Sequence, residues 1–185
     1  MHPSSDPSEV FQFCPRCGSA HFQAISLRAK KCSACSFSYY FNASAAVAAL
    51  IFDREGKLML TRRAINPHIG MLDLPGGFIE PMESAEDAVR RELMEELGVE
   101  VTGMEYLVSF PNEYPFSGMS VFTLDMAFRV SVRSFQGIRP MDDIASFEFY
   151  EPDAVPMNEI AAPSIRQIVE WTRVNIRGKG DRAIK

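Results

Sequence analysis

No long hydrophobic run occurs in this sequence of 185 residues, although 46% of them are hydrophobic. A helix that crosses a membrane needs about 20 consecutive apolar residues, and no segment approaches that length. The first residues, Met-His-Pro-Ser-Ser-Asp, also lack the basic flank and apolar stretch of a secretory signal. We therefore expect no membrane contact and a cytoplasmic location.

An excess of positive charge is equally absent. Lysine and arginine number 19 against 24 aspartate and glutamate residues, which gives a net charge of -5. A chain of this sign has no overall field that would attract nucleic acid or an anionic membrane. Nucleic acid is therefore an unexpected partner. An anionic substrate would need a local source of positive charge, such as metal ions or a few arginines.

Cysteine is missing from the chain after residue 35. The four that occur form two close pairs, Cys14–Cys17 and Cys32–Cys35, with fourteen residues between the pairs. In a reducing compartment, four thiolates at this spacing suit a tetrahedral zinc site better than disulfides. We predict a zinc ribbon over residues 13–42, which would draw its folding energy from the metal because so short a segment cannot bury a core.

The segments on either side of the ribbon differ from it in pattern. Residues 1–12 are polar and contain proline, which predicts a flexible tail, and residues 179–185 form a second tail. Between them, residues 43–178 are predicted to form one larger domain. Hydrophobic periodicity there predicts strands over 45–52, 57–63, 105–110 and 120–132, and a last helix from about 162 to 177.

One further helix carries most of the chemical signal. Ser84, with Asp87 three residues on, offers an N-cap, and Gly98 ends the helix after Leu97. Glu92, Glu95 and Glu96 stand at positions i, i+3 and i+4, so their side chains converge on one patch, where they repel one another unless a cation is bound. A solvated acidic face is the ordinary alternative for such a run.

The direction of the side chains around this helix argues against an ordinary acidic face. At about 100° per residue, Glu96 falls between Ala85 and Val89, and Glu92 falls between Ala85 and Ala88. These alanine and valine residues form the side that faces the core. Carboxylates at the edge of a buried face must be paired or coordinated, and hard oxygen ligands favour Mg²⁺ or Mn²⁺.

Residues Gly77 to Val99 resemble the Nudix box. Gly77, five residues, Glu83, seven residues and then Arg91-Glu-Leu-Met-Glu-Glu-Leu-Gly-Val99 match that motif in full, and Arg62-Arg63 and Asp73-Leu-Pro-Gly-Gly77 resemble the segments that precede it. With a zinc ribbon ahead of the box, the chain is similar to the NADH pyrophosphatase branch of the Nudix hydrolases. The resemblance implies an α+β fold, an α/β/α sandwich with a mixed sheet.

The resemblance also implies roles for individual residues. The ligands of the Mg²⁺ or Mn²⁺ cluster would be Glu92, Glu95, Glu96 and the Gly76 carbonyl. Glu83 and Arg91 would form the pair that orients the helix. Either Glu92 or Glu95 would take the proton from the attacking water. Asp143 lies in the segment where many Nudix enzymes place a further acidic ligand or base, although an acidic loop without catalytic function is an alternative.

Candidate substrate contacts are Arg63, at a strand end, and the aromatic residues Tyr114 and Phe116. The last two belong to Ser109-Phe-Pro-Asn-Glu-Tyr-Pro-Phe-Ser117, which partly matches the S-Q-P-W-P-F-P-x-S signature of the NADH pyrophosphatase branch. An asparagine replaces the tryptophan, which removes one aromatic surface for stacking on a base. ADP-ribose and related dinucleotides therefore stand beside NADH and NAD as expected substrates.

Together these features predict a Mg²⁺-dependent pyrophosphohydrolase that cleaves the diphosphate of a nucleotide substrate with metal-activated water. A homodimer is compatible with the sequence. Two alternatives remain. One is a Nudix-fold sensor that binds a nucleotide but cleaves it weakly. The other is a capped-RNA hydrolase in which the ribbon contacts RNA through a modest basic cluster made of Arg16, His21, Arg28, Lys30 and Lys31.

Overall fold

The computed structural model describes residues 5–176, which form two compact units. The first unit holds the chain up to Ser44 together with Glu113–Phe122, and the second holds Ala45–Asn112 and the chain from Thr123 onward. No helix within residues 5–176 combines the length and the apolar composition needed to cross a membrane. The tail expected over 179–185 lies outside the described residues.

The first unit is built on a small antiparallel sheet, β1 (Phe22–Ser26), β2 (Ala29–Cys32) and β3 (Ser38–Tyr40), in the order β1-β2-β3. Its buried cluster consists only of Cys14, Phe22 and Cys32, with Cys35 and Phe37 packed against it. Such a core is too small to hold the segment by burial alone, as expected for a ribbon that a metal stabilises.

Part of the segment predicted as a flexible tail is helical. Helix α1 (Pro7–Val10) begins after Asp6, whose side chain accepts a hydrogen bond from the Ser8 N–H. Lys30 on β2 holds the end of this segment, because its Nζ donates to the carbonyl oxygens of Ser8 at 3.0 Å and Phe11 at 2.7 Å. Lys30 is only 8% exposed and lies 5.2 Å from the centroid of the Phe22 ring. It therefore does not belong to a solvent-exposed basic cluster, contrary to the RNA-contact alternative.

Two three-stranded sheets make up the β-structure of the larger domain. One has the order β4-β8-β7, from β4 (Ser44–Ile51), β8 (Met119–Val132) and β7 (Val101–Phe116). The other has the order β6-β5-β9, from β6 (Leu72–Asp73), β5 (Leu58–Arg63) and β9 (Ile144–Tyr150).

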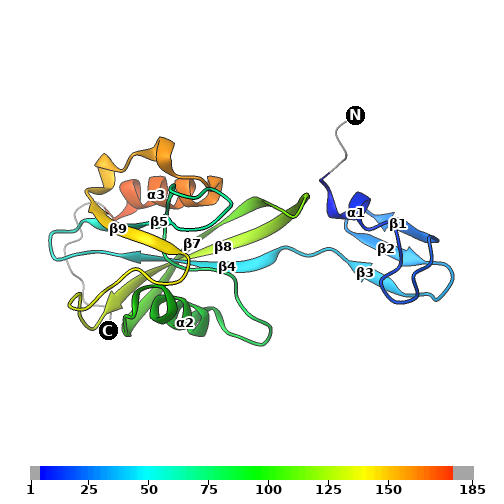
Figure 1. Ribbon diagram of the computed structural model, residues 1–185, viewed down its shortest axis with the longest axis horizontal. Coiled ribbons are helices and arrows are strands. Elements are labelled where there is room, and N and C mark those ends of the chain that lie inside the picture. Colours follow the sequence, from blue (N-terminus) through cyan, green and yellow to red (C-terminus); the bar gives the residue numbers. More distant parts are fainter. Residues whose placement is uncertain (1–4, 177–185) are drawn as a thin grey trace. The chain divides into compact units, whose positions relative to one another are not determined.

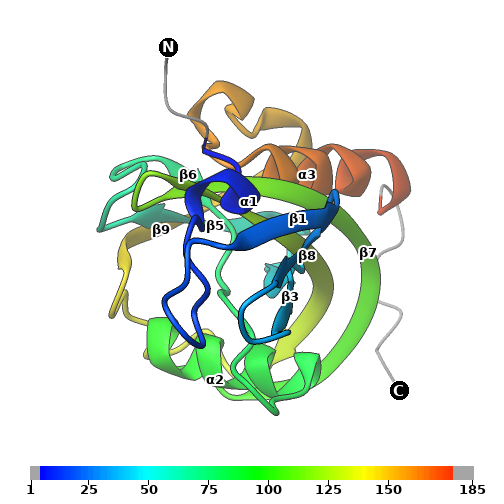
Figure 2. The same ribbon diagram turned by 90° about the vertical axis from the view of Figure 1, so that its right-hand side faces the viewer.

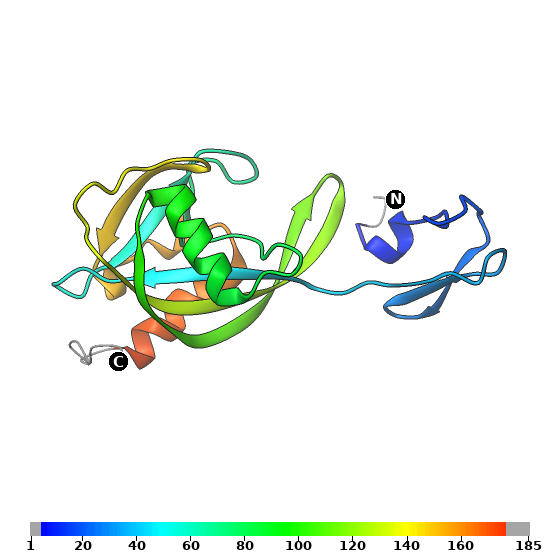
Figure 3. The ribbon, with the colours of Figure 1, turned by 90° about the horizontal axis from the view of Figure 1, so that it is seen from below.

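Helices cover both sides of these strands. Helix α2 (Ala85–Leu97) lies on one side and α3 (Pro163–Asn175) on the other (Figure 1), and the view from below shows α2 lying across the strands (Figure 3). Two short 3-10 helices, Pro152–Ala154 and Met157–Glu159, precede α3. This α+β sandwich is the architecture that the sequence predicted.

Strand β4 is buried on both faces, which explains its nearly continuous apolar sequence. Because side chains alternate along a strand, Val47, Ala49 and Ile51 enter the hydrophobic cluster on the α2 side, while Ala48 and Leu50 enter the cluster on the α3 side. Strand β4 thus separates two cores, each closed by one helix.

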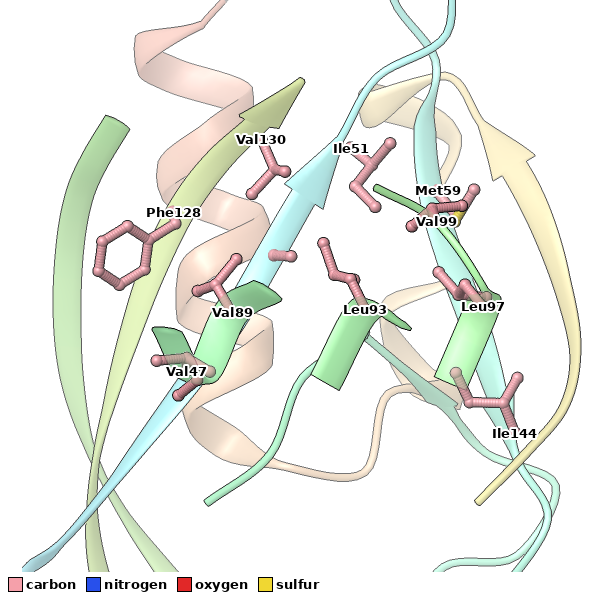
Figure 4. Close-up of a cluster of buried hydrophobic side chains, with 12 residues drawn as sticks. Val47, Ile51, Met59, Val89, Leu93, Leu97, Val99, Phe128, Val130 and Ile144 are labelled. Atoms are coloured by element: carbon pink, nitrogen blue, oxygen red, sulfur yellow. The ribbon is translucent and has the colours of Figure 1, made fainter. Parts of the chain in front are cut away.

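Helix α2 packs through one apolar stripe. Val89, Leu93 and Leu97 point toward β4 and its neighbours (Figure 4), and each is at most 1% exposed. The Ser84 side chain accepts a hydrogen bond from the Asp87 N–H at the start, and Gly98 adopts the left-handed conformation (φ 66°) at the end. The helix boundaries match those predicted from the sequence.

Strand β7 is longer than the predicted strand over 105–110. It continues to Phe116 although it contains Pro111 and Pro115. Proline is tolerated on an edge strand such as β7, because the outer edge of the sheet needs no N–H donor. Since the two prolines are four residues apart, both face the same edge. Ser117 (φ 52°) and Gly118 (φ 75°) then form a tight two-residue turn into β8. Both strands curve strongly (Figure 2).

Truncation of the α2 stripe is expected to destabilise the domain. Leu93→Ala should lower the free energy of unfolding by about 2–5 kcal/mol, because it removes a fully buried side chain and leaves a cavity. Met94→Ala, next along the helix but 49% exposed, is the matched control and should change it by less than about 1 kcal/mol. Urea unfolding of both variants checks the prediction, and equal losses would contradict the described packing.

Candidate active site

Residues Pro75–Gly77, which we call the glycine segment, run alongside β4 like an extra strand. The N–H groups of Val47 and Ala49 donate to the carbonyl oxygens of Gly77 at 2.9 Å and Pro75 at 2.8 Å. Gly76 has φ 138°, and a Cβ there would lie 2.2 Å from the Val47 carbonyl oxygen. Only glycine fits this position.

Gly77 lies against the side chain of a catalytic candidate. A Cβ on Gly77 would lie 2.6 Å from Glu92 Oε1. The Glu92 carboxylate therefore packs directly on the backbone of the glycine segment. The first glycine of the box thus gives space to one of its glutamates.

Glu96 is the most deeply buried of the box carboxylates. It is 6% exposed, and its Oε2 accepts a hydrogen bond from the Gly76 N–H at 2.9 Å. Burial raises the pKa of Glu96 to about 9, and the negative charges of Glu92, Asp73 and Asp143 contribute. The expectation that this side chain lies on the core side of the helix is confirmed, since Val89 beside it is also buried.

Arg91 connects the other three glutamates. Its Nε and Nη2 donate to the two carboxylate oxygens of Glu83 at 2.8 and 2.9 Å, and these bonds lower the pKa of Glu83 to about 2. Its Nη1 donates to Glu92 Oε1 at 2.8 Å and Glu95 Oε2 at 3.1 Å. Nη2 also donates to the Phe78 carbonyl at 3.0 Å, which ties the helix to the residue directly after the glycine segment.

The three metal-ligand candidates on α2 differ in environment. Glu96 is buried, Glu92 is half-buried with a pKa raised by burial, and Glu95 is exposed. Within residues 5–176, their oxygens do not form a group as tight as that of the cysteines. The donor set nevertheless suits a hard cation, because such a cation prefers carboxylate oxygens and buried carboxylates need positive charge.

Asp143 and Arg63 lie in the same neighbourhood as Glu96. The Ala64 N–H donates to the Asp143 carbonyl at 2.7 Å, and Arg63 pairs with Ile144 across β5 and β9. Burial raises the pKa of Asp143, the negative Asp142 adds to this effect, and the Arg63 charge opposes it. The Met141 N–H, two residues before Asp143, donates to the Glu96 carbonyl oxygen at 2.8 Å, so this segment contacts the glutamate helix.

Tyr114 and Phe116, the predicted aromatic contacts, lie at the end of β7 in the first unit. Their rings are stacked, with centroids 6.3 Å apart and planes inclined by 21°. Phe116 is 59% exposed, so it offers an aromatic face to solvent. Their contact with substrate stays a prediction.

The four cysteines converge as a tetrahedral site requires. All four sulfur atoms lie within 4.8 Å of one another, and the Cys14–Cys35 and Cys17–Cys32 sulfur pairs are each 3.7 Å apart. A zinc ion with bonds of about 2.3 Å to four sulfurs would place them about 3.8 Å apart. None of the four forms a disulfide. These residues fit a zinc ion.

Sequence reasoning missed the residue that holds Arg63. Asp73 Oδ2 accepts a hydrogen bond from Arg63 Nη1 at 3.0 Å, and Asp73 Oδ1 accepts one from the Leu74 N–H at 2.9 Å. Asp73 stood in the motif that precedes the glycines, but only as part of a resemblance. The sequence feature that could have indicated this contact is an acidic residue at a strand end, next to that motif, together with the arginines at the end of the preceding strand.

Comparison with protein families matches residues 43–172 to the NUDIX domain. The chain belongs to the NUDIX family. The resemblance of Gly77–Val99 to the Nudix box is therefore confirmed, and the fold agrees with that of a solved relative. The crystal structure of a NUDIX hydrolase from Nitrosomonas europaea is 24% identical, with a TM-score of 0.67, over 90% of this chain and 93% of that one.

Curated relatives include enzymes of the NudC group. The NAD-capped RNA hydrolase NudC of Vibrio vulnificus is 26% identical over 170 residues, 92% of this chain and 62% of that protein. Nudix hydrolase 19, chloroplastic, of Arabidopsis thaliana is 41% identical over 104 residues, 55% of this chain and 24% of that protein. The chain thus spans less than two thirds of the length of either relative.

The cysteine site should bind zinc in the isolated protein. We expect about one zinc ion per chain by elemental analysis, and loss of that zinc in Cys32→Ser, because three thiolates close the site poorly. Ser36→Ala, beside the second cysteine pair, is the control and should retain the metal. Equal zinc content in wild type and Cys32→Ser would contradict the assignment.

Burial of Glu96 should make stability depend on pH. Its folded pKa, about 9, exceeds the ordinary value of 4.5, so the folded protein binds the extra proton between these values. Without Mg²⁺ or Mn²⁺, the stabilising effect of the protonated carboxyl is complete below pH 4.5 and is lost as the pH rises toward 9. The melting temperature of wild type should therefore fall relative to Glu96→Gln between pH 6 and 9.

Mg²⁺ should oppose this loss, since it binds the deprotonated carboxylate. Differential scanning fluorimetry across this pH range, with and without Mg²⁺, measures both effects. Parallel curves for wild type and Glu96→Gln would show that Glu96 does not titrate there.

Proposed function

We propose that this protein is a Mg²⁺- or Mn²⁺-dependent hydrolase of phosphoanhydride bonds, which cleaves the diphosphate of NADH, NAD, ADP-ribose or a related dinucleotide. The observation that carries the proposal is the buried Glu96 carboxylate. Within residues 5–176 it accepts one hydrogen bond, from Gly76, and pairs with no basic side chain. A buried carboxylate of this kind calls for a cation.

Four groups would hold the cation: Glu92, Glu95, Glu96 and the Gly76 carbonyl. When bound, Mg²⁺ would supply a Lewis acid that polarises the phosphate and lowers the pKa of the attacking water. Glu83 and Arg91 orient this set, because Arg91 binds Glu92 and Glu95 through one nitrogen while its other two hold Glu83. Entry of a cation would release the two carboxylates that share Nη1.

In the reaction, the water oxygen forms a bond to one phosphorus and the bridging P–O bond breaks. The other phosphate leaves with its half of the substrate, and the water proton passes to a carboxylate. Glu92, Glu95 and Asp143 are the candidates for that proton. Arg63 would bind a phosphate oxygen, and Tyr114 and Phe116 would offer aromatic faces to a base or nicotinamide ring.

NAD-capped RNA is a second candidate substrate, favoured by the similarity to the NAD-capped RNA hydrolase NudC of Vibrio vulnificus. The NAD at such an RNA end carries the same diphosphate linkage as free NAD. The ribbon residues left exposed for an RNA contact are Arg16, His21, Arg28 and Lys31. Their number is modest in a chain of net charge -5.

A hydrolysis panel tests the proposal. We expect cleavage of NADH, NAD or ADP-ribose into two phosphate-bearing products with Mg²⁺, identified by mass, with FAD, diadenosine polyphosphates, dNTPs and NAD-capped RNA as further members. Glu96→Gln should lower kcat/KM by on the order of a hundredfold or more. Glu86→Gln, at an exposed glutamate in the first turn of α2, is the matched control and should keep full activity.

Full activity of Glu96→Gln at saturating Mg²⁺ would contradict the metal-ligand assignment. Circular dichroism of each variant separates loss of chemistry from loss of folding. No cleavage of any panel member by wild type would contradict the hydrolase proposal and favour a nucleotide sensor.

A further inference from the structure

Two arginines that are neighbours in sequence have different partners at the end of β5. Arg62 Nη2 pairs with Glu159 at 2.8 Å, and its Nη1 donates to the Gly70 carbonyl at 3.0 Å. Arg63 Nη1 pairs with Asp73 at 3.0 Å, and its Nε donates to the Pro67 carbonyl at 2.9 Å. Each guanidinium thus has one carboxylate and one carbonyl partner.

Only one of the two arginines lies beside the candidate active site. The pairing of β5 with β9 shifts by one residue between Arg62, opposite Ser146, and Arg63, opposite Ile144. Bulges of this kind redirect a side chain and are frequent next to active sites. The backbone next to Arg63 lies beside the Asp143 segment, because the Ala64 N–H donates to the Asp143 carbonyl oxygen at 2.7 Å.

Asp73 links Arg63 to the glycine segment. It ends β6, where it pairs with Thr61 of β5, and the residues that follow lead directly to Gly76. One carboxylate oxygen binds the guanidinium and the other accepts the Leu74 N–H. Because both oxygens are engaged and the side chain is only 20% exposed, this carboxylate has little freedom to move.

The contacts of Arg63 leave one nitrogen for an anion. Nε is bound to Pro67 and Nη1 to Asp73, while Nη2 makes no hydrogen bond to any residue in 5–176. A guanidinium held through two of its nitrogens loses little further freedom when the third binds phosphate. The arrangement suits a fixed contact to a diphosphate.

We propose that Asp73 is a positioning residue, which fixes the guanidinium of Arg63 so that its Nη2 binds a phosphate oxygen of the substrate. This inference rests on the proposed function, since it takes a diphosphate as the ligand. Asp73 itself touches no substrate. It acts through Arg63 alone, so its removal should have no effect once Arg63 is absent.

A double-mutant cycle tests this dependence. With ADP-ribose and NADH at saturating Mg²⁺, Arg63→Ala should raise KM about tenfold, and Asp73→Asn should raise it about threefold or more with kcat changed less than twofold, because a ground-state contact is weakened. In the Arg63→Ala background, Asp73→Asn should raise KM no further. Glu159→Gln, which breaks the matched Arg62 pair, should leave KM unchanged.

Arg63→Lys supplies a second test that does not alter Asp73. Lysine keeps the charge beside Asp73 but has no second nitrogen for the phosphate, so KM should rise as in Arg63→Ala. A rise in KM from Asp73→Asn that persists without Arg63, or a KM unchanged in Asp73→Asn or Arg63→Lys, would overturn the inference while leaving the hydrolase proposal intact. Absence of hydrolysis by wild type would overturn both.

Discussion

The approach of the glycine segment to β4 on one side and to α2 on the other constrains everything around the candidate site. Gly76 lies against the Val47 carbonyl and donates its N–H to Glu96, while Gly77 leaves room for Glu92. A side chain at Gly76 would collide with the backbone of β4, and one at Gly77 would displace the Glu92 carboxylate. The carboxylates are therefore held near the core by backbone, and their charge has to be balanced locally.

Arg91 supplies part of that balance. It neutralises Glu83 and binds Glu92 and Glu95, but within residues 5–176 it donates no hydrogen bond to Glu96. Burial raises the pKa of Glu96 to about 9, so this carboxyl is protonated near neutral pH unless a cation binds it. The apolar stripe of the helix, with Leu93 at its centre, keeps the helix in place.

Periodicity and spacing were sufficient for the parts of this structure that depend on local sequence. The α2 boundaries follow from Ser84 and Gly98, and the buried position of Glu96 follows from its angle relative to Val89. The length of β7 did not follow, because its prolines are tolerated only on an edge strand, and edge position depends on the partner strands. The burial of Lys30 likewise depends on where α1 packs, a contact between segments about twenty residues apart that no local pattern contains.

The Arg63–Asp73 pair shows the same limit within the site and indicates how the site differs from the cysteine cluster. Four thiolates close their own coordination shell, so a sequence spacing alone can predict the zinc site. The glutamate helix instead leaves coordination and charge incomplete, and the remaining contacts come from β5, β6 and the segment before β9. Such contacts depend on strand register, which here shifts by one residue between Arg62 and Arg63. Under the proposed function, recognition of the substrate would therefore depend on tertiary pairing more than binding of zinc by the cysteines would.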